Sequence, residues 1–143
     1  MILVDANILL YAYHPRSAHH QACRAWLEEA FSASLPVGLP WLTLWAFLRI
    51  GTNPRAFERP LRMTEARSIV AAWLELPIVR NVEPGDRYWE ILSGLLVQAQ
   101  VSGPLVTDAA LAALALENGA SLCTTDRDFA RFPGVRTIDP TKT

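Results

Sequence analysis

Lysine is almost absent from this chain of 143 residues. Lys142 is the only one, and the other twelve of the thirteen basic residues are arginines. No glycine-rich loop ends in Gly-Lys-Ser or Gly-Lys-Thr, which excludes a nucleotide-binding P-loop. Haloacid-dehalogenase phosphatases and phospho-receiver domains neutralise a phosphoryl group with a lysine on a later strand, and a lysine next to the carboxyl terminus cannot serve that role. These two classes are therefore excluded as well.

Long apolar runs and cysteine motifs are missing too. No apolar stretch reaches the roughly 18 residues of a transmembrane helix, and no basic segment precedes the apolar residues 2–10, so we expect neither a membrane span nor a signal peptide. Cys23 and Cys123 have neither metal-site nor redox spacing. We therefore expect two reduced thiols in a cytoplasmic protein that does not associate with membranes.

The overall composition is typical of a globular protein. Apolar residues make up 51% of the chain and charged residues 19%, with a net charge of −1. A chain of this length is expected to form one domain over residues 1–143 and to bury about 68–70% of its unfolded surface.

The arginines are concentrated in one segment. Five lie within nineteen residues that also contain Glu58 and Glu65: Arg49, Arg55, Arg59, Arg62 and Arg67. Because arginine makes bidentate contacts with phosphate, a local patch for nucleic acid is one interpretation. A solvated face or a surface for a protein partner is another, and the sequence leaves the choice open.

Asp5, Asp108 and Asp126 each follow a short run rich in apolar and β-branched residues. Ligands of open parallel sheets bind outside the carboxyl ends of the strands, so we expect these three acids to converge at one edge. Two carboxylates about 5 Å apart repel by roughly 3 kcal/mol at an effective dielectric near 20. Protonation or a divalent cation relieves this repulsion, and oxygen ligands without nearby cysteine or histidine favour Mg²⁺, with Mn²⁺ as the alternative.

Each aspartate also has a purely structural interpretation. Asp5 could close an Asx-turn, Asp108 could favour the dipole of a following helix, and Asp126 could cap the turn 126–129. Their shared edge of the predicted sheet favours a site over three separate structural roles. Hydrolysis of a phosphodiester is the chemistry expected of such a site.

Short strands alternating with helices predict an α/β fold with a parallel sheet. Strands are expected at 2–4, 36–39, 78–79, 121–124 and 135–138. Helices are expected at 18–31, 41–51, 64–76, 83–100 and 109–118. Ser17 and Thr64 are expected to cap two of these helices and Gly119 to end the last one, whereas residues 7–13 are too few to assign.

Two further groups of side chains need an interpretation. His14, His19 and His20 lie close in sequence, but their spacing does not suit zinc, so we expect solvated histidines near a helix start. Trp41 and Trp45 lie on one face of a predicted helix. Burial in the core is the common role of such residues, and contact with a second copy or a protein partner is the alternative.

Taken together, these motifs resemble those of PIN-domain endoribonucleases, specifically the toxins of VapBC-type toxin–antitoxin pairs. The resemblance covers essentially the whole chain and rests on four segments: 1–7, 47–55, 105–115 and 124–129. It implies a three-layer PIN-like fold with about five parallel strands flanked by helices. It also implies a Mg²⁺- or Mn²⁺-dependent, homodimeric ribonuclease that cuts RNA and is inhibited by an antitoxin, whose carboxyl-terminal segment lies across the active site.

The resemblance also implies roles for individual acids. Asp5, Asp108 and Asp126 match the first, third and last acids of the family, so they are the expected metal ligands and catalytic residues. Asp128 is an additional carboxylate that we include in the catalytic group. Residues expected to orient these carboxylates or a metal-bound water are Asn7, Thr124 and Thr125.

Ala46 is the one departure from the family pattern. The family usually places a glutamate here, shortly before the stretch Phe47-Leu48-Arg49. Either Asp128 and water complete the site, or the enzyme is slower and binds metal more weakly. The third interpretation is a catalytically weak module that binds RNA or a protein partner, and the sequence leaves all three open.

Overall fold

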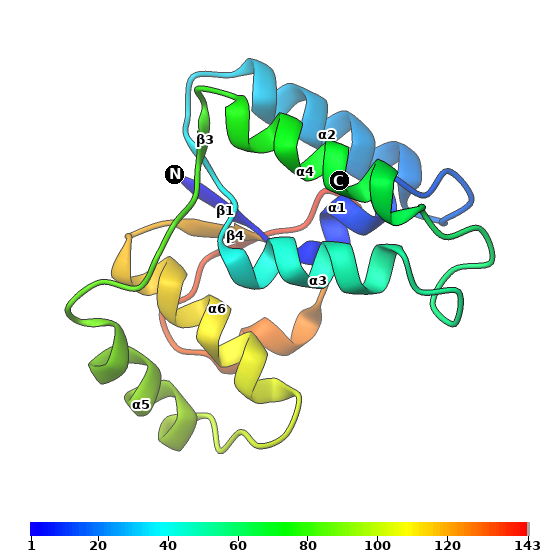
Figure 1. The fold of residues 1–143 in the computed structure, drawn as a ribbon. Coiled ribbons are helices and arrows are strands. Elements are labelled where there is room, and N and C mark those ends of the chain that lie inside the picture. The colour runs from blue at the N-terminus through cyan, green and yellow to red at the C-terminus, as the bar shows by residue number, and fades with distance from the viewer. Residues whose placement is uncertain (143) are drawn as a thin grey trace.

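Five short parallel strands form the centre of the structure, a computed structural model that describes residues 1–142 (Figure 1). Thr143, the last residue of the predicted domain, lies outside the described residues. The strands are β1 (Ile2–Val4), β2 (Val37–Gly38), β3 (Val79–Arg80), β4 (Ser121–Cys123) and β5 (Thr137–Ile138). They run in the order β3-β2-β1-β4-β5, and every neighbouring pair is parallel. The predicted α/β class and the five-stranded parallel sheet are confirmed.

Helices connect the strands and cover both faces of the sheet. The α-helices are α1 (Ala6–Ala12), α2 (His20–Ser32), α3 (Trp41–Gly51), α4 (Met63–Glu75), α5 (Tyr88–Gln98) and α6 (Leu105–Glu117), and a 3-10 helix η1 spans Arg127–Arg131. In Figure 1, α1 to α4 gather on one side of the strands and α5 and α6 on the other. No helix among the described residues is long and apolar enough to cross a membrane.

The alternation of side chains along β1 and β4 divides the core into two parts. Val4 and Cys123 pack with the buried residues of α1 to α4, whereas Leu3 and Leu122 pack with those of α5, α6 and η1. Both central strands are therefore buried from two sides, which explains why they read as continuous apolar runs in the sequence.

The register of β1 and β4 sets where both strands end. Val4 lies opposite Cys123, and the backbone N–H of Asp5 donates to the carbonyl of Cys123 at 2.9 Å. On the other side of β1, Leu3 lies opposite Gly38, where an added Cβ would come within 2.1 Å of the Leu3 Cδ2 atom. Glycine in β2 therefore makes room for the Leu3 side chain.

Several helix starts differ from the sequence prediction. Residues 7–13, left unassigned by their sequence, are largely helical in α1. Ser17 does not cap α2, because its hydroxyl donates to the Tyr11 carbonyl at 3.3 Å. Thr64 lies inside α4, whose first turn is closed by the Glu65 carboxylate accepting from the backbone N–H of Arg62 at 3.2 Å.

The expectation of solvated histidines is wrong for His14. Its side chain is buried, and its two ring nitrogens lie 2.7 Å from the Leu10 carbonyl oxygen and 3.2 Å from that of Gly51. The ring also stacks on Phe57 with 3.6 Å between the centroids. His14 therefore ties the end of α1 to the end of α3 and to the loop that follows α3.

Candidate active site

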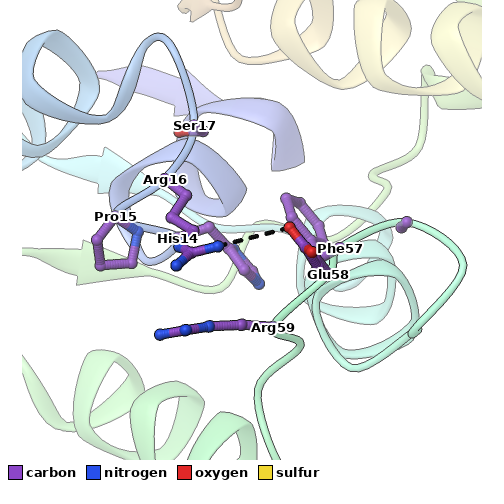
Figure 2. Close-up of a pocket in the computed structure, with 8 residues that line it drawn as sticks. His14, Pro15, Arg16, Ser17, Phe57, Glu58 and Arg59 are labelled. Carbon is purple, nitrogen blue, oxygen red and sulfur yellow. Dashed lines mark hydrogen bonds and ion pairs between the residues drawn. The ribbon is translucent and has the colours of Figure 1, made fainter.

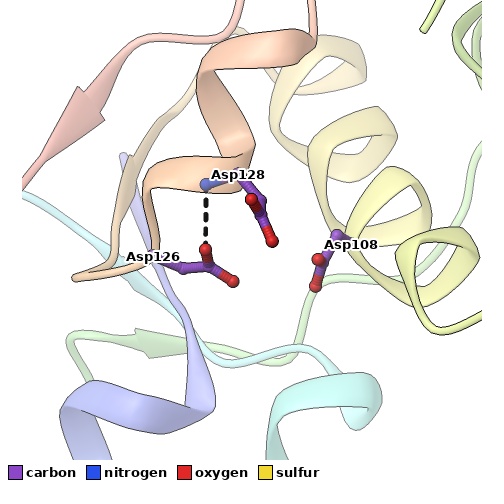
Figure 3. Close-up of side chains that lie close together, drawn as sticks. All are labelled: Asp108, Asp126 and Asp128. Atoms are coloured by element: carbon purple, nitrogen blue, oxygen red, sulfur yellow. Dashed lines mark hydrogen bonds between the residues drawn. The ribbon is translucent and has the colours of Figure 1, made fainter.

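Three carboxylates converge beyond the carboxyl ends of β1 and β4. Asp108 projects from the first turn of α6, while Asp126 and Asp128 project from the start of η1 (Figure 3). One oxygen of each lies within 4.8 Å of one oxygen of the others. Of the three acids expected to converge, Asp108 and Asp126 therefore do so, with Asp128 as the third member of the group. Asp108 lies in the first turn of a helix that begins at Leu105, four residues before the predicted start.

Asp126 also has the capping role considered for it from the sequence. Its Oδ1 accepts a hydrogen bond of 2.9 Å from the backbone N–H of Asp128, which starts η1. This bond occupies only one of the two carboxylate oxygens. The cap therefore holds Asp126 and Asp128 side by side without excluding a cation.

Asp5 lies beside this group but is not part of its closest set. Its Oδ2 accepts a hydrogen bond of 2.8 Å from the Thr124 hydroxyl. The same hydroxyl oxygen accepts from the Asp126 backbone N–H at 3.0 Å and from the Asn7 side-chain amide at 3.4 Å. Thr124 thus links the two strand ends, and the orienting role expected of Asn7 and Thr124 has a direct hydrogen-bond basis.

Burial and the neighbouring negative charges both disfavour the ionised form of these acids. Burial, followed by the charges of Asp126, Asp5 and Asp128, raises the pKa of Asp108 to about 6, although the Arg131 charge opposes this shift. Burial also raises the pKa of Asp5, against the Thr124 hydrogen bond that lowers it. Binding of a cation or of a proton would therefore stabilise both carboxyl groups.

A small cavity of about 50 Å³ lies between Asp5 and Asp108. Ala46 of α3 contributes to its wall, together with Thr43 and Thr107. Thr43 is buried and its hydroxyl donates to the Val4 carbonyl at 2.7 Å, which fixes α3 to the end of β1. A longer side chain at position 46 would therefore start beside the acids, at the position where the family that the chain resembles usually has a glutamate.

The donor set suits a hard divalent cation. Within the described residues, the group that could hold a metal consists of aspartate oxygens alone, and magnesium prefers oxygen ligands. Asn7 adds a second indication: its Oδ1 is buried and has no hydrogen-bond partner in the described part of the chain. A water bound to a cation is the kind of donor that would satisfy this oxygen.

Arg131 belongs to no motif of the sequence, yet its charge acts on Asp108. It stands three residues after Asp128 in η1, and residues i and i+3 of a 3-10 helix eclipse one another. The three-residue spacing of Asp128 and Arg131 is therefore the feature of the sequence from which Arg131 could have been identified. For Thr125, by contrast, the described structure gives no side-chain hydrogen bond to the aspartates, so its orienting role stays a prediction.

The comparisons with known proteins agree with this geometry. The family model described as the PIN domain matches residues 2–135. The chain belongs to the PIN-domain family. Among the relatives of this PIN domain, ribonuclease VapC37 of Mycobacterium tuberculosis is 44% identical over 140 residues, which cover 98% of this chain and 97% of that protein. Ribonuclease VapC31 of the same species is 39% identical over 98% of this chain and 99% of its own length.

Solved structures share the fold at low sequence identity. The chain of VapBC2 from Rickettsia felis, bound to a DNA fragment from its promoter, has a TM-score of 0.71 and 15% identity, covering 97% of this PIN domain and 98% of that chain. VapC20 of Mycobacterium tuberculosis, a toxin that cleaves the sarcin-ricin loop, has a TM-score of 0.69 and 20% identity over 95% and 99% of the two chains. The expected PIN-like fold is therefore confirmed.

The raised pKa of Asp108 predicts a pH-dependent stability in the absence of divalent ions. The folded state holds the Asp108 proton up to about pH 6, whereas the unfolded chain releases it near pH 3.8. Stability should therefore fall as pH rises between these values, because the folded state binds more protons there. Asp108→Asn should raise the melting temperature at pH 7 to 8 in EDTA, and this gain should vanish near pH 4. A gain that is the same at both pH values would contradict the raised pKa of Asp108.

Proposed function

We propose that this PIN domain, spanning residues 1–143, is a divalent-metal-dependent endoribonuclease and the toxin of a VapBC-type toxin–antitoxin pair. The observation that carries the proposal is the convergence of Asp108, Asp126 and Asp128 beside Asp5. Relatives that match over nearly the whole chain are named ribonucleases. Two buried free cysteines suit the reducing cytoplasm, where we place the enzyme.

In this proposal Asp5 and Asp108 are the principal ligands of Mg²⁺, with Mn²⁺ as the alternative, and Asp126 completes the site. When bound, such an ion would lower the pKa of a water molecule, so that the water can lose a proton and attack phosphorus, and would stabilise charge on the phosphate oxygens. The Thr124 hydroxyl holds the Asp5 carboxylate in place. Asp126 keeps one oxygen for the site while the other is bound by the Asp128 N–H.

Asp128 is exposed and is proposed to act on water or on the RNA strand from the solvent side. Its backbone is held by Asp126, whereas its own carboxylate accepts no hydrogen bond within the described residues. This freedom suits a group that positions an incoming molecule. It also suits the idea that Asp128 compensates for the carboxylate missing at Ala46.

A catalytically weak module that binds RNA or a protein partner is the second candidate. The observation in its favour is Ala46, which lines the cavity beside Asp5 and Asp108 with a methyl group instead of a carboxylate. Four acids still meet at the site without it, so we favour the enzyme.

The proposed partners are an RNA substrate, a cognate antitoxin and a second copy of the chain. Two tryptophans of α3 support the homodimer: Trp41 is 39% and Trp45 60% exposed, and their rings stack with centroids 6.4 Å apart. They border an apolar groove of about 390 Å³ that also includes Val82 and Tyr88. An exposed aromatic pair beside a groove is typical of the core of a protein interface, so the second copy is proposed to bind here. The antitoxin is proposed to cover the acids.

Removal of either principal ligand should strongly reduce cleavage. Asp5→Asn and Asp108→Asn should each reduce Mg²⁺-dependent cleavage of RNA at least about 100-fold, since changes to outer-shell partners alone typically cost 10- to 100-fold. Asp86→Asn, a change at an exposed acid just before α5, is the matched control. Purified wild-type protein and the three variants would be compared at equal metal concentration. If the wild type showed no metal-dependent cleavage, the proposed ribonuclease activity would be wrong and the binding module would be favoured.

Ala46→Glu should lower the Mg²⁺ concentration that gives half-maximal RNA cleavage, because an added anionic oxygen at the cavity attracts the cation. In EDTA the variant should be less stable than the wild type, since each additional close carboxylate pair costs roughly 3 kcal/mol. Ala46→Gln has the same shape without the charge and serves as the control. A folded Ala46→Glu protein whose metal requirement equals that of Ala46→Gln would show that position 46 does not face the ion.

Trp45→Lys should weaken the homodimer at least about tenfold, as expected for an aromatic residue near the centre of an interface. Its melting temperature measured on the monomer should change little, because an exposed substitution usually shifts stability by less than about 0.5 kcal/mol. Analytical ultracentrifugation of the variant and of Leu74→Lys, which alters an exposed leucine of α4, provides the measurement. Equal dissociation constants for both variants and the wild type would exclude the tryptophan surface from the dimer.

A further inference from the structure

A hollow of about 380 Å³ lies at the end of α1 away from Asp5. Two segments line it: residues 14–17, which follow α1, and residues 56–59 in the loop between α3 and α4. Its volume is in the range of sites that bind small ligands. The catalytic acids do not contribute to it, so it is a separate feature of the surface.

Two arginines line the hollow, one from each segment. Figure 2 shows the Arg16 side chain extending from the segment that follows α1 and the Arg59 side chain from the loop between α3 and α4. The Arg16 guanidinium lies 3.5 Å from the Glu58 carboxylate, but both side chains are mostly exposed, at 62% and 85%. An exposed ion pair of this kind contributes little, so an incoming phosphate can replace it. None of the ion pairs among the described residues involves Arg59.

The wall behind the arginines is aromatic and held in place. Phe57 lines the hollow and stacks on the buried His14 ring, with an angle of 11° between the ring planes. The His14 nitrogens lie against the carbonyls of Leu10 and Gly51, which fixes the pair to the ends of α1 and α3. An aromatic side chain held beside arginines combines the two contacts by which proteins bind single-stranded nucleic acid.

The hollow and the acids lie at the two ends of one short helix. Asp5 is the N-cap of α1, and residue 14 follows shortly after its last residue, Ala12. A seven-residue helix is about 10 Å long, so a strand of a few nucleotides can reach from one end to the other. The hollow contains Arg59 of the arginine-rich segment and adds Arg16, which lies outside that segment in sequence.

We propose that this hollow binds one nucleotide of the RNA strand at a distance from the bond that is cut, with its phosphate between Arg16 and Arg59 and its base against Phe57. The proposal rests on the ribonuclease function proposed above and adds a second contact point for the substrate. It also selects the nucleic-acid interpretation for this part of the arginine-rich segment. Arg16, Arg59 and Phe57 bind and position the strand and take no part in the chemistry.

Arg16→Met and Arg59→Met test the proposal, because methionine keeps the apolar stem and removes the charge. Each should weaken the binding of a labelled single-stranded RNA about tenfold, as expected for the loss of a charge-assisted contact. Each should also reduce the slope of log affinity against log salt by about 0.7, the contribution of one phosphate contact on a single strand. Fluorescence anisotropy in the Asp108→Asn background measures binding without cleavage, and Arg59→Lys should recover most of the affinity.

Arg87→Met is the matched control, because Arg87 is an exposed arginine at the start of α5, on the opposite side of the sheet, and its guanidinium forms an exposed ion pair with Glu90. Equal affinities and salt slopes for the Arg16, Arg59 and Arg87 variants, together with metal-dependent cleavage by the wild type, would overturn this inference and leave the ribonuclease intact. Loss of affinity in the Arg16 and Arg59 variants without cleavage by the wild type would instead support the hollow as an RNA site and reject the enzyme.

Discussion

The parallel pairing of β1 with β4 is the constraint on which the site depends. The N–H of Asp5 donates to the Cys123 carbonyl, so both strands leave the sheet at the same level, and the Thr124 hydroxyl then reaches the Asp5 carboxylate from 119 residues away in the sequence. The acids themselves repel one another. Apolar burial on both faces of the two strands therefore supplies the free energy that holds them together.

Much of this arrangement could be predicted because it follows from short-range patterns. An acid that directly follows a strand of a parallel sheet, as Asp5 does, lies at the carboxyl edge of that sheet, where ligands bind. For Asp108 the predicted start of the helix at residue 109 is four residues late: residues 105–107, which are rich in β-branched side chains, form the first turn of α6 after Pro104 at the N-cap. The preference of β-branched residues for strands is weak enough for tertiary packing to override it.

The parts that could not be predicted depend on contacts between distant segments. The buried His14 ring contacts the Gly51 carbonyl, 37 residues away, and no residue near His14 in the sequence predicts this contact. Likewise, Ala46 lines a cavity beside Asp5 and Asp108, and the Thr43 hydroxyl that fixes α3 to the end of β1 reaches a carbonyl 39 residues away in the sequence. Periodicity identifies the face of a helix, but it does not say which neighbour that face will meet or how closely.

The order of the strands along the chain has a consequence for synthesis. β1 comes first in the sequence, but its partner β4 and the acids Asp126 and Asp128 come more than a hundred residues later. At roughly 5–20 residues per second, a ribosome needs on the order of 6–25 s to make the segment between them. Until then Asp5 has no sheet edge to share with the other acids. The acids therefore cannot come together before β4 and η1 have been synthesised, however early β1 leaves the ribosome.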